Sequence, residues 1–149
     1  MHIRLTRRDL LHGSCNIVAA AALAPLIARQ ASAALSPITV GFIYAATRQD
    51  YGWNQAHAVA ARKIAQLEGV KLVEQEKVPE TAEVEKVMES MINLDNCKVL
   101  FPTSFGFWPF IQKLAPKYPQ VLFLHAGGLW KEGDAKNTIG YRGYMEEPH

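Results

Sequence analysis

Three short stretches of the chain place a tryptophan beside polar side chains: residues 45–53, 102–108 and 125–130. The protein has three tryptophans, and all lie in or at the edge of these stretches: Trp53, Trp108 and Trp130. Flat aromatic faces beside hydrogen-bonding groups are typical of a pocket for a planar ligand. The alternative is that the tryptophans belong to the core. The pattern favours a binding site for a planar molecule.

Two polar residues of these stretches allow more than one interpretation. Asp50 either caps a helix that begins near Trp53 or accepts a hydrogen bond from a ligand N–H. His125, which follows a predicted strand, either hydrogen-bonds to the backbone or contacts the ligand. Both interpretations stay open for both residues.

Ser104 adds a catalytic alternative, because Ser104, His125 and Asp50 all follow predicted strands and could form a Ser-His-Asp triad. However, residues 103–106 read Thr-Ser-Phe-Gly and lack the first glycine of a G-x-S-x-G nucleophile elbow. Serine and aspartate at strand ends more often bind ligand hydroxyls or cap helices. We therefore expect a binding protein rather than an enzyme.

Other common chemistries find no support in the sequence. No G-x-G-x-x-G follows the first predicted strand and no P-loop motif occurs, so we expect no nucleotide cofactor. His57, Cys97 and His125 lie in different elements, which argues against a metal site. Four arginines and one acid fall in residues 1–33, and the remainder holds 12 basic and 13 acidic side chains. That balance gives no basic face for nucleic acid.

The residues around these stretches alternate between strand and helix patterns. Strands are predicted at residues 38–44, 70–75, 99–101, 121–124 and 138–141. Such alternation predicts an α/β fold with a mainly parallel, flavodoxin-like sheet. A sheet of this kind binds ligands at the carboxyl ends of its strands, where the three tryptophan-bearing stretches lie.

Three helices are predicted between the strands. The first has the apolar stripe Ala56, Val59, Ala60, Ile64 and Leu67, and Gly69 is taken as its C-terminal glycine. The second begins at residues 79–81 and has the apolar face Val84, Val87, Met88, Met91 and Ile92. The third spans residues 107–114 and is ended by Pro116.

The first 33 residues have the layout of a secretory signal peptide. A basic start precedes an uncharged run over residues 17–28, and Ala31-Ser32-Ala33 provides an A-x-A cleavage site. Twelve apolar residues would span only about 18 Å as a helix, too little for a hydrocarbon core of about 30 Å. Arg7 and Arg8 resemble the twin-arginine export signal; the alternative is an ordinary signal whose arginines are adjacent by chance. We expect a signal peptide at 1–33 and a mature protein at 34–149 in the periplasm.

Four ordered motifs stand out in the sequence: residues 40–44 (VGFIY), 50–57 (DYGWNQAH), 101–107 (FPTSFGF) and 123–128 (FLHAGG). Together they resemble the basic membrane protein (BMP) family of substrate-binding proteins of ABC importers. The resemblance implies a type I periplasmic binding fold, in which two α/β lobes close on a purine-like ligand. It also implies an ABC permease in the inner membrane as the partner, and no enzymatic activity.

The same resemblance assigns roles to individual residues. Trp53 corresponds to the stacking aromatic after the first strand, Asn54 lies beside it, and Ser104 and Phe105 lie in the loop after the third strand. Trp130 is a second candidate for stacking. Ala45 and Ala126 stand where nucleoside-binding members carry acids, which favours a bare nucleobase such as adenine over a nucleoside.

The length of the chain adds one further expectation. Receptors of this family are about twice as long, so residues 34–149 correspond to the N-terminal lobe only, without the second lobe. Two other functions stay open: a hydrolase that uses Ser104 or His125, and a sensory binding module.

Overall fold

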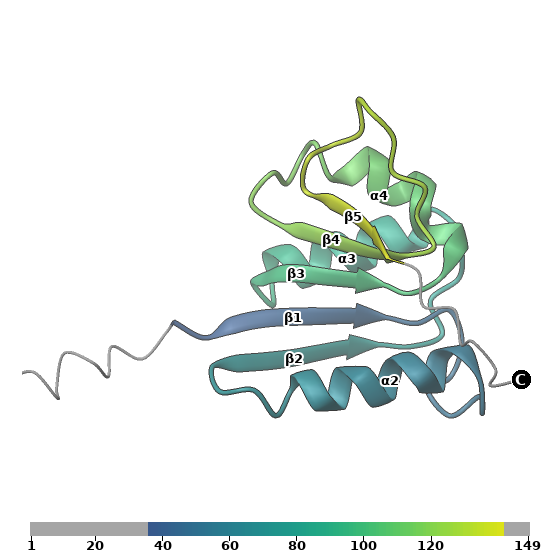
Figure 1. Ribbon diagram of the computed structural model, residues 1–149, viewed down its shortest axis with the longest axis vertical. Helices are drawn as coiled ribbons and strands as arrows, with labels where there is room; N and C mark the ends of the chain where they lie inside the picture. The colour runs from purple at the N-terminus through teal and green to yellow at the C-terminus, as the bar shows by residue number, and fades with distance from the viewer. Residues whose placement is uncertain (1–35, 142–149) are drawn as a thin grey trace, which may run out of the picture. The chain divides into compact units, whose positions relative to one another are not determined.

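The computed structural model describes residues 36–141, so the predicted signal peptide and the predicted cleavage site lie outside the described residues. Within them, five parallel strands form one sheet in the order β2-β1-β3-β4-β5 (Figure 1). The strands are β1 (Ile38–Ile43), β2 (Val70–Gln75), β3 (Cys97–Pro102), β4 (Leu122–Ala126) and β5 (Thr138–Tyr141). The prediction of an α/β fold with a parallel sheet is confirmed.

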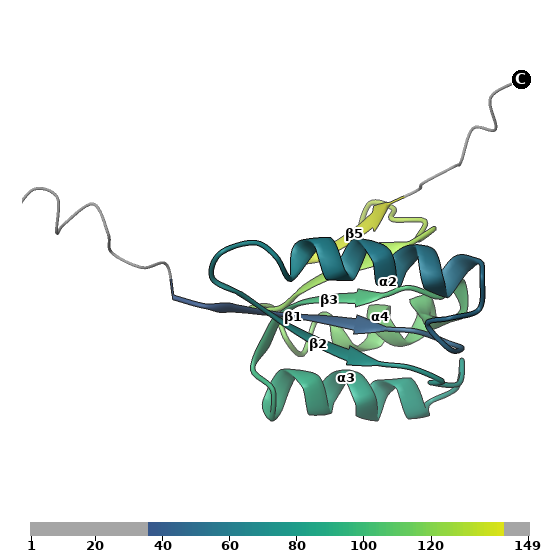
Figure 2. The ribbon, with the colours of Figure 1, turned by 90° about the horizontal axis from the view of Figure 1, so that it is seen from below.

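Three helices and one short 3-10 turn connect the strands: α2 (Trp53–Ile64), α3 (Glu83–Asn93), η1 (Phe105–Phe107) and α4 (Trp108–Leu114). Helix α2 lies on one face of the sheet, whereas α3 and α4 lie on the other (Figure 2). The chain moves in one direction along the sheet from β1 to β2, and in the opposite direction from β2 through β3 to β4. Because each crossover is right-handed, this reversal places the connecting helices on opposite faces.

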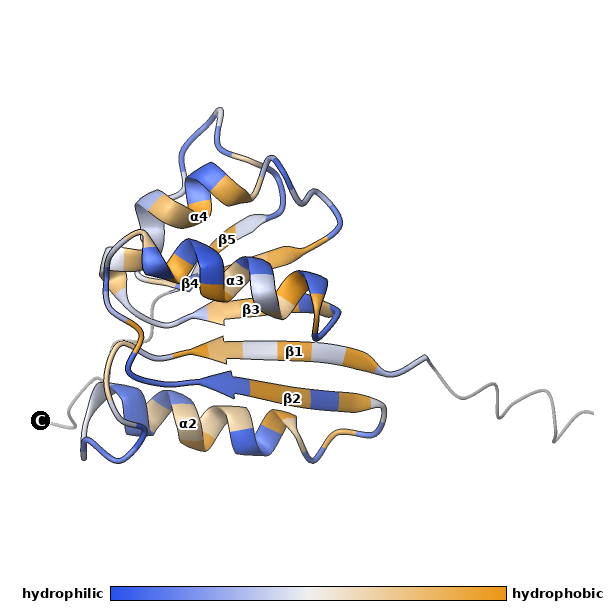
Figure 3. Cartoon of the chain, turned by 180° about the vertical axis from the view of Figure 1, so that it is seen from behind, coloured by the Kyte–Doolittle hydropathy of each residue, from blue (hydrophilic) through white to orange (hydrophobic). Residues whose placement is uncertain are grey.

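The core under α3 and α4 follows the predicted pattern. Val84, Met88, Met91 and Ile92 of α3 are buried against β1 and β3, and Val87 packs against the same cluster. The opposite side of α3 is largely hydrophilic, as Figure 3 shows. Gly41 of β1 allows this close packing, since a Cβ there would lie 2.6 Å from Leu100 Cδ2 and 2.9 Å from Met91 Cε.

Helix α2 differs from its prediction in two respects. It ends at Ile64, and Leu67, expected on its apolar stripe, lies beyond the helix and is 60% exposed. The side chains that it buries are Asn54, Ala58 and Ala61, whereas Ala56 and Ala60 of the expected stripe are exposed. Of the expected stripe, Ile64 packs against the core cluster that contains Val40 and Phe42 of β1.

The boundaries of three other elements also differ from the predictions. Gly69 adopts a φ of +77° and leads into β2, five residues after α2 ends. The second helix begins at Glu83 rather than at residues 79–81, which leaves Glu80 in a loop. Residues 105–107 form a 3-10 turn before α4, so Phe107 is not part of the third helix. The last two differences leave Glu80 and residues 105–107 outside the long helices, after the carboxyl ends of β2 and β3.

Candidate functional site

The loops that follow β1, β2, β3 and β4 gather at the carboxyl edge of the sheet, because all five strands run in the same direction (Figure 1). A groove of about 820 Å³ runs along α2 and reaches this edge. We call it the α2 groove. Its lining is mostly apolar and aromatic and includes Phe42, Trp53, Phe101, Phe105, Leu129 and Tyr141.

Trp53, the first residue of α2, lines the α2 groove and is 52% exposed. Its indole Nε1 donates a hydrogen bond of 2.7 Å to the main-chain oxygen of Thr103. The ring also lies 4.8 Å from the His57 ring, centroid to centroid. Trp53 therefore presents aromatic surface to solvent while its polar atom is held by the loop after β3.

Phe105 projects from that loop and is 65% exposed. It lines the α2 groove with Trp53, and a Cβ at Gly127 would lie 3.1 Å from its ring. The two aromatic side chains predicted from the sequence are thus brought to one groove. The structure therefore brings Trp53 and Phe105 of the predicted site to the same groove.

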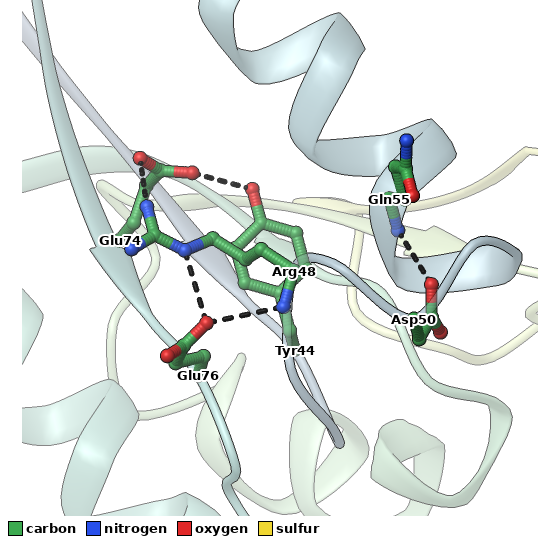
Figure 4. Close-up of polar contacts among 6 residues, drawn as sticks. All are labelled: Tyr44, Arg48, Asp50, Gln55, Glu74 and Glu76. Atoms are coloured by element: carbon green, nitrogen blue, oxygen red, sulfur yellow. Dashed lines mark hydrogen bonds and ion pairs between the residues drawn. The ribbon is translucent and has the colours of Figure 1, made fainter.

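Asp50 caps α2 (Figure 4). Its Oδ1 accepts hydrogen bonds from the main-chain N–H of Gly52 (2.9 Å) and Gln55 (3.0 Å), and its Oδ2 accepts from the main chain and the side chain of Asn54. These donors, Gly52 first, hold the pKa of the Asp50 carboxyl far below its usual range. Of the two interpretations left open by the sequence, the structure supports the helix cap.

Asn54 is buried, with 6% of its surface exposed. Its Nδ2 donates to Asp50 at 2.8 Å, and its Oδ1 has no hydrogen-bond partner among the described residues. The side chain therefore serves the start of α2 and does not line the α2 groove as Trp53 does. The predicted neighbours Trp53 and Asn54 point to different surroundings because successive helical residues lie about 100° apart.

Ser104 interacts with a residue that the sequence analysis did not identify. Its hydroxyl donates to Glu80 Oε1, and the same oxygen accepts the Gly106 N–H at 3.1 Å. The sequence predicts Glu80 at the start of a helix, so its role in the loop after β2 was not foreseen. Pro79 gave no signal against a helix start there, because proline is common at the first helical position.

His125 is completely buried, and its Nε2 donates to the main-chain oxygen of Ser104 at 2.8 Å. The Trp108 ring packs against it at 5.2 Å, and burial lowers the pKa of the imidazole. Its Nδ1 has no partner among the described residues. Of the two interpretations of His125, the hydrogen bond to the backbone is the one observed.

These contacts do not form the Ser-His-Asp triad considered above. Ser104 Oγ bonds to Glu80, His125 bonds to the backbone oxygen of Ser104, and Asp50 bonds to the first turn of α2. No nucleophile–base–acid chain connects these three side chains, so the contacts do not support the catalytic alternative. A metal site is not indicated either: residues 36–141 contain no group of three or more His, Cys, Asp or Glu side chains that could hold an ion.

The other two tryptophans occupy different positions. Trp130 is 50% exposed in the loop after β4, but the residues of that loop that line the α2 groove are Gly127 and Leu129. Trp108 begins α4 and packs on His125 and Gly128, where a Cβ would lie 3.0 Å from the indole. Trp108 is therefore part of the packing beneath the edge rather than of its surface.

A second polar cluster lies at the carboxyl ends of β1 and β2 (Figure 4). Arg48 forms ion pairs with Glu74 at 2.7 Å and Glu76 at 3.1 Å, and the Tyr44 hydroxyl donates to Glu74 at 2.8 Å. Burial, followed by the hydrogen bond to Glu74, raises the pKa of Tyr44 above its usual value. The cluster ties the first loop to β2 and neutralises the arginine internally.

A parallel sheet with an aromatic groove at its carboxyl edge is the arrangement of a ligand-binding α/β lobe. A family model confirms this class and makes it specific. Residues 38–148 match the Bmp family, described as ABC transporter substrate-binding protein PnrA-like, and the chain belongs to that family. Among residues 36–141, no helix has both the length and the apolar character needed to cross a membrane.

Individual relatives agree with this assignment. A purine-binding protein of Brucella abortus (strain 2308) is 34% identical over 109 residues, which cover 72% of this chain and 31% of the relative. A solute-binding protein of an ABC transporter system from Aeropyrum pernix K1 superposes with a TM-score of 0.62 at 22% identity, over 71% of this chain and 28% of that one. The fold is that of one lobe of such a protein.

The same fold also occurs in a transcriptional activator of the comK gene from Bacillus halodurans. That structure gives a TM-score of 0.58 at 20% identity, over 68% of this chain and 33% of that one. At such identities the likeness concerns the fold alone. The chain spans about a third of the length of the curated relative and of both structures.

Proposed function

We propose that this chain is the N-terminal lobe of an extracytoplasmic solute-binding protein that binds a purine-like ligand for an ABC importer. The proposed ligand is a nucleobase such as adenine, or a nucleoside. The observation that carries the proposal is the pair of exposed aromatic side chains, Trp53 and Phe105, in one groove at the carboxyl edge. Family membership and the purine-binding relative support it.

The chemistry of the edge fits a planar ligand. Base-on-aromatic stacking contributes about 1–3 kcal/mol per base and tolerates different bases, because every base has a π face. The carboxylates near the edge are already engaged: Asp50 by α2, and Glu74 and Glu76 by Arg48. Ala45 and Ala126 supply no further acid. An uncharged base therefore fits this lobe better than a ligand that needs a carboxylate clamp.

The remaining parts of the proposal concern the cell. The signal at residues 1–33, read as a twin-arginine signal, would export the protein to the periplasm, where a permease of the inner membrane would accept the ligand. A double change of Arg7 and Arg8 to lysine should then leave the precursor in the cytoplasm. Normal export of that variant would leave only an ordinary signal peptide.

The binding experiment is an NMR titration of the chain with adenine and, separately, adenosine. We expect Trp53→Ala to weaken adenine binding by about 10- to 100-fold, and Trp53→Phe, which keeps an aromatic ring, to weaken it much less. Trp130→Ala is the matched control. If Trp130→Ala weakens binding and Trp53→Ala does not, the stacking face belongs to the loop after β4.

Two observations separate an importer from the alternatives. Deletion of the gene should abolish uptake of labelled adenine if the protein serves a permease, whereas a sensory module would leave uptake intact. Turnover of the ligand by the purified chain would indicate a hydrolase. The contacts of Ser104 and His125 favour binding without turnover.

A further inference from the structure

Residues 103–107, which we call the aromatic loop, are held by four separate anchors. Thr103 donates through both its main-chain N and its hydroxyl to the Ile43 oxygen of β1. Trp53 of α2 donates to the Thr103 oxygen, and His125 of β4 donates to the Ser104 oxygen. Glu80, from the loop after β2, accepts from Ser104 and Gly106. Elements from the part of the sheet between β2 and β4 thus converge on five residues.

Glu80 differs from the other anchors because it holds both neighbours of Phe105. One oxygen, Oε1, accepts from the Ser104 hydroxyl and from the Gly106 N–H, and Phe105 lies between these two residues. The Phe105 side chain is 65% exposed and gains little fixation from packing. Its orientation therefore depends on the main chain on either side of it.

Gly106 and Glu80 fit each other. A Cβ at residue 106 would lie 2.5 Å from Glu80 Cδ and 2.7 Å from its Oε1, closer than two unbonded atoms can approach. In the observed position, the carboxylate occupies the space that a side chain at residue 106 would fill. This close approach adds an anchor at Ser104 and Gly106, on both sides of Phe105.

We infer that Glu80 is a positioning residue, which fixes the aromatic loop so that Phe105 faces the α2 groove beside Trp53. Glu80 is exposed, and a hydrogen bond of an exposed group contributes little to global stability. What the contact does supply is preorganisation, since a loop that is already ordered loses less entropy when a ligand binds. The expected effect on ligand affinity rests on the proposed function, whereas the contact of Glu80 with Ser104 and Gly106 does not.

The test uses amide hydrogen exchange and adenine titration of three variants of the whole chain. Glu80→Ala removes the acceptor, and Glu80→Gln keeps an amide oxygen in its place. Glu83→Ala removes an exposed charge three residues away, in the first turn of α3, and is the matched control. We expect the exchange of the Gly106 amide to rise about 10-fold in Glu80→Ala, to recover in Glu80→Gln and to stay unchanged in Glu83→Ala.

The consequence for ligand binding is a loss of about 2- to 10-fold in adenine affinity in Glu80→Ala, with recovery in Glu80→Gln. Equal exchange of Gly106 in Glu80→Ala and Glu83→Ala would overturn the inference. So would a loosened loop with unchanged adenine affinity. If the unmodified chain binds no adenine, the proposed ligand fails, and the exchange of Gly106 still decides whether Glu80 fixes the loop.

Discussion

The two faces of the sheet are covered to very different extents. On the face of α3 and α4, the side chains of Ile43, Leu100 and Phe123 are completely buried. On the face of α2, the helix lies over β1 and β2, while Leu124 and Tyr141 are only partly buried and Ile139 is 47% exposed. Among residues 36–141, no second helix lies beside α2 on this face (Figure 2).

This difference suggests that one face of the sheet serves mainly stability and the other mainly ligand binding. Buried parallel sheets need cover on both faces, so the half-covered face is the one where apolar surface is available. It is also the face on which the α2 groove reaches Trp53 and Phe105. The fully covered face supports the loops, and the open face presents the aromatic side chains.

The largest expected effect compares the same substitution on both faces. Leu100→Ala removes a fully buried side chain of β3 and should lower the free energy of unfolding by about 2–5 kcal/mol. Leu124→Ala, on the open face of β4, should cost roughly half as much, because that side chain already contacts water. Urea unfolding monitored by circular dichroism measures both. Equal losses would show that the two faces contribute alike.

Cys97 tests how tightly the covered face excludes water. Burial raises the pKa of the Cys97 thiol to about 11, with a smaller contribution from the charge of Asp95. In a Cys15→Ser background at pH 8, native Cys97 should react with a disulfide reagent at least about 100-fold more slowly than in denaturant. Rapid labelling of the native chain would mean that the covered face opens readily.

Asp50 gives a pH-dependent comparison at the start of α2. Its pKa is lower in the folded than in the unfolded chain, so its stabilisation is present above the usual carboxyl pKa of about 3.9 and is lost as the pH falls below it. Asp50→Ala should therefore lower the melting temperature at pH 7, and the difference from the unmodified chain should shrink toward pH 3. Asp50→Asn, which keeps one acceptor oxygen, should lie between them.

The smallest expected change in stability concerns Ile139 on the open face. Ile139→Thr should alter the free energy of unfolding by less than about 1 kcal/mol but reduce concentration-dependent self-association, because it breaks the exposed apolar surface. Leu94→Thr changes an isolated leucine, 81% exposed, at the end of α3 and serves as the control. Sedimentation velocity measures both. An equal reduction by Leu94→Thr would rule out the open face as the associating surface.

The comparison of faces also explains the incorrect prediction for α2. The sequence showed a stripe of Ala56, Ala60 and Ile64, which by its spacing should contact the sheet. In the structure these residues line the α2 groove; Ile64 also packs against the core, but Ala56 and Ala60 are exposed, and Ala58 and Ala61 are the alanines that are buried. The apolar residues of α2 are mostly alanines, which define no dominant face, so periodicity alone cannot assign one.

The sequence by itself determined the parallel α/β fold, the buried face of α3 and the position of the stretches that carry Trp53 and Phe105 at the carboxyl edge. These follow from local patterns: β-branched runs, helical spacing of large apolar residues, and loops that must emerge at one edge. Pairing between distant residues has no such local pattern. Only the tertiary structure decided that Ser104 binds Glu80 and that His125 holds the Ser104 backbone, because each of these contacts joins segments that the folded sheet brings together. The Asp50 cap is a contact within residues 50–55, which the sequence offered as one of two interpretations.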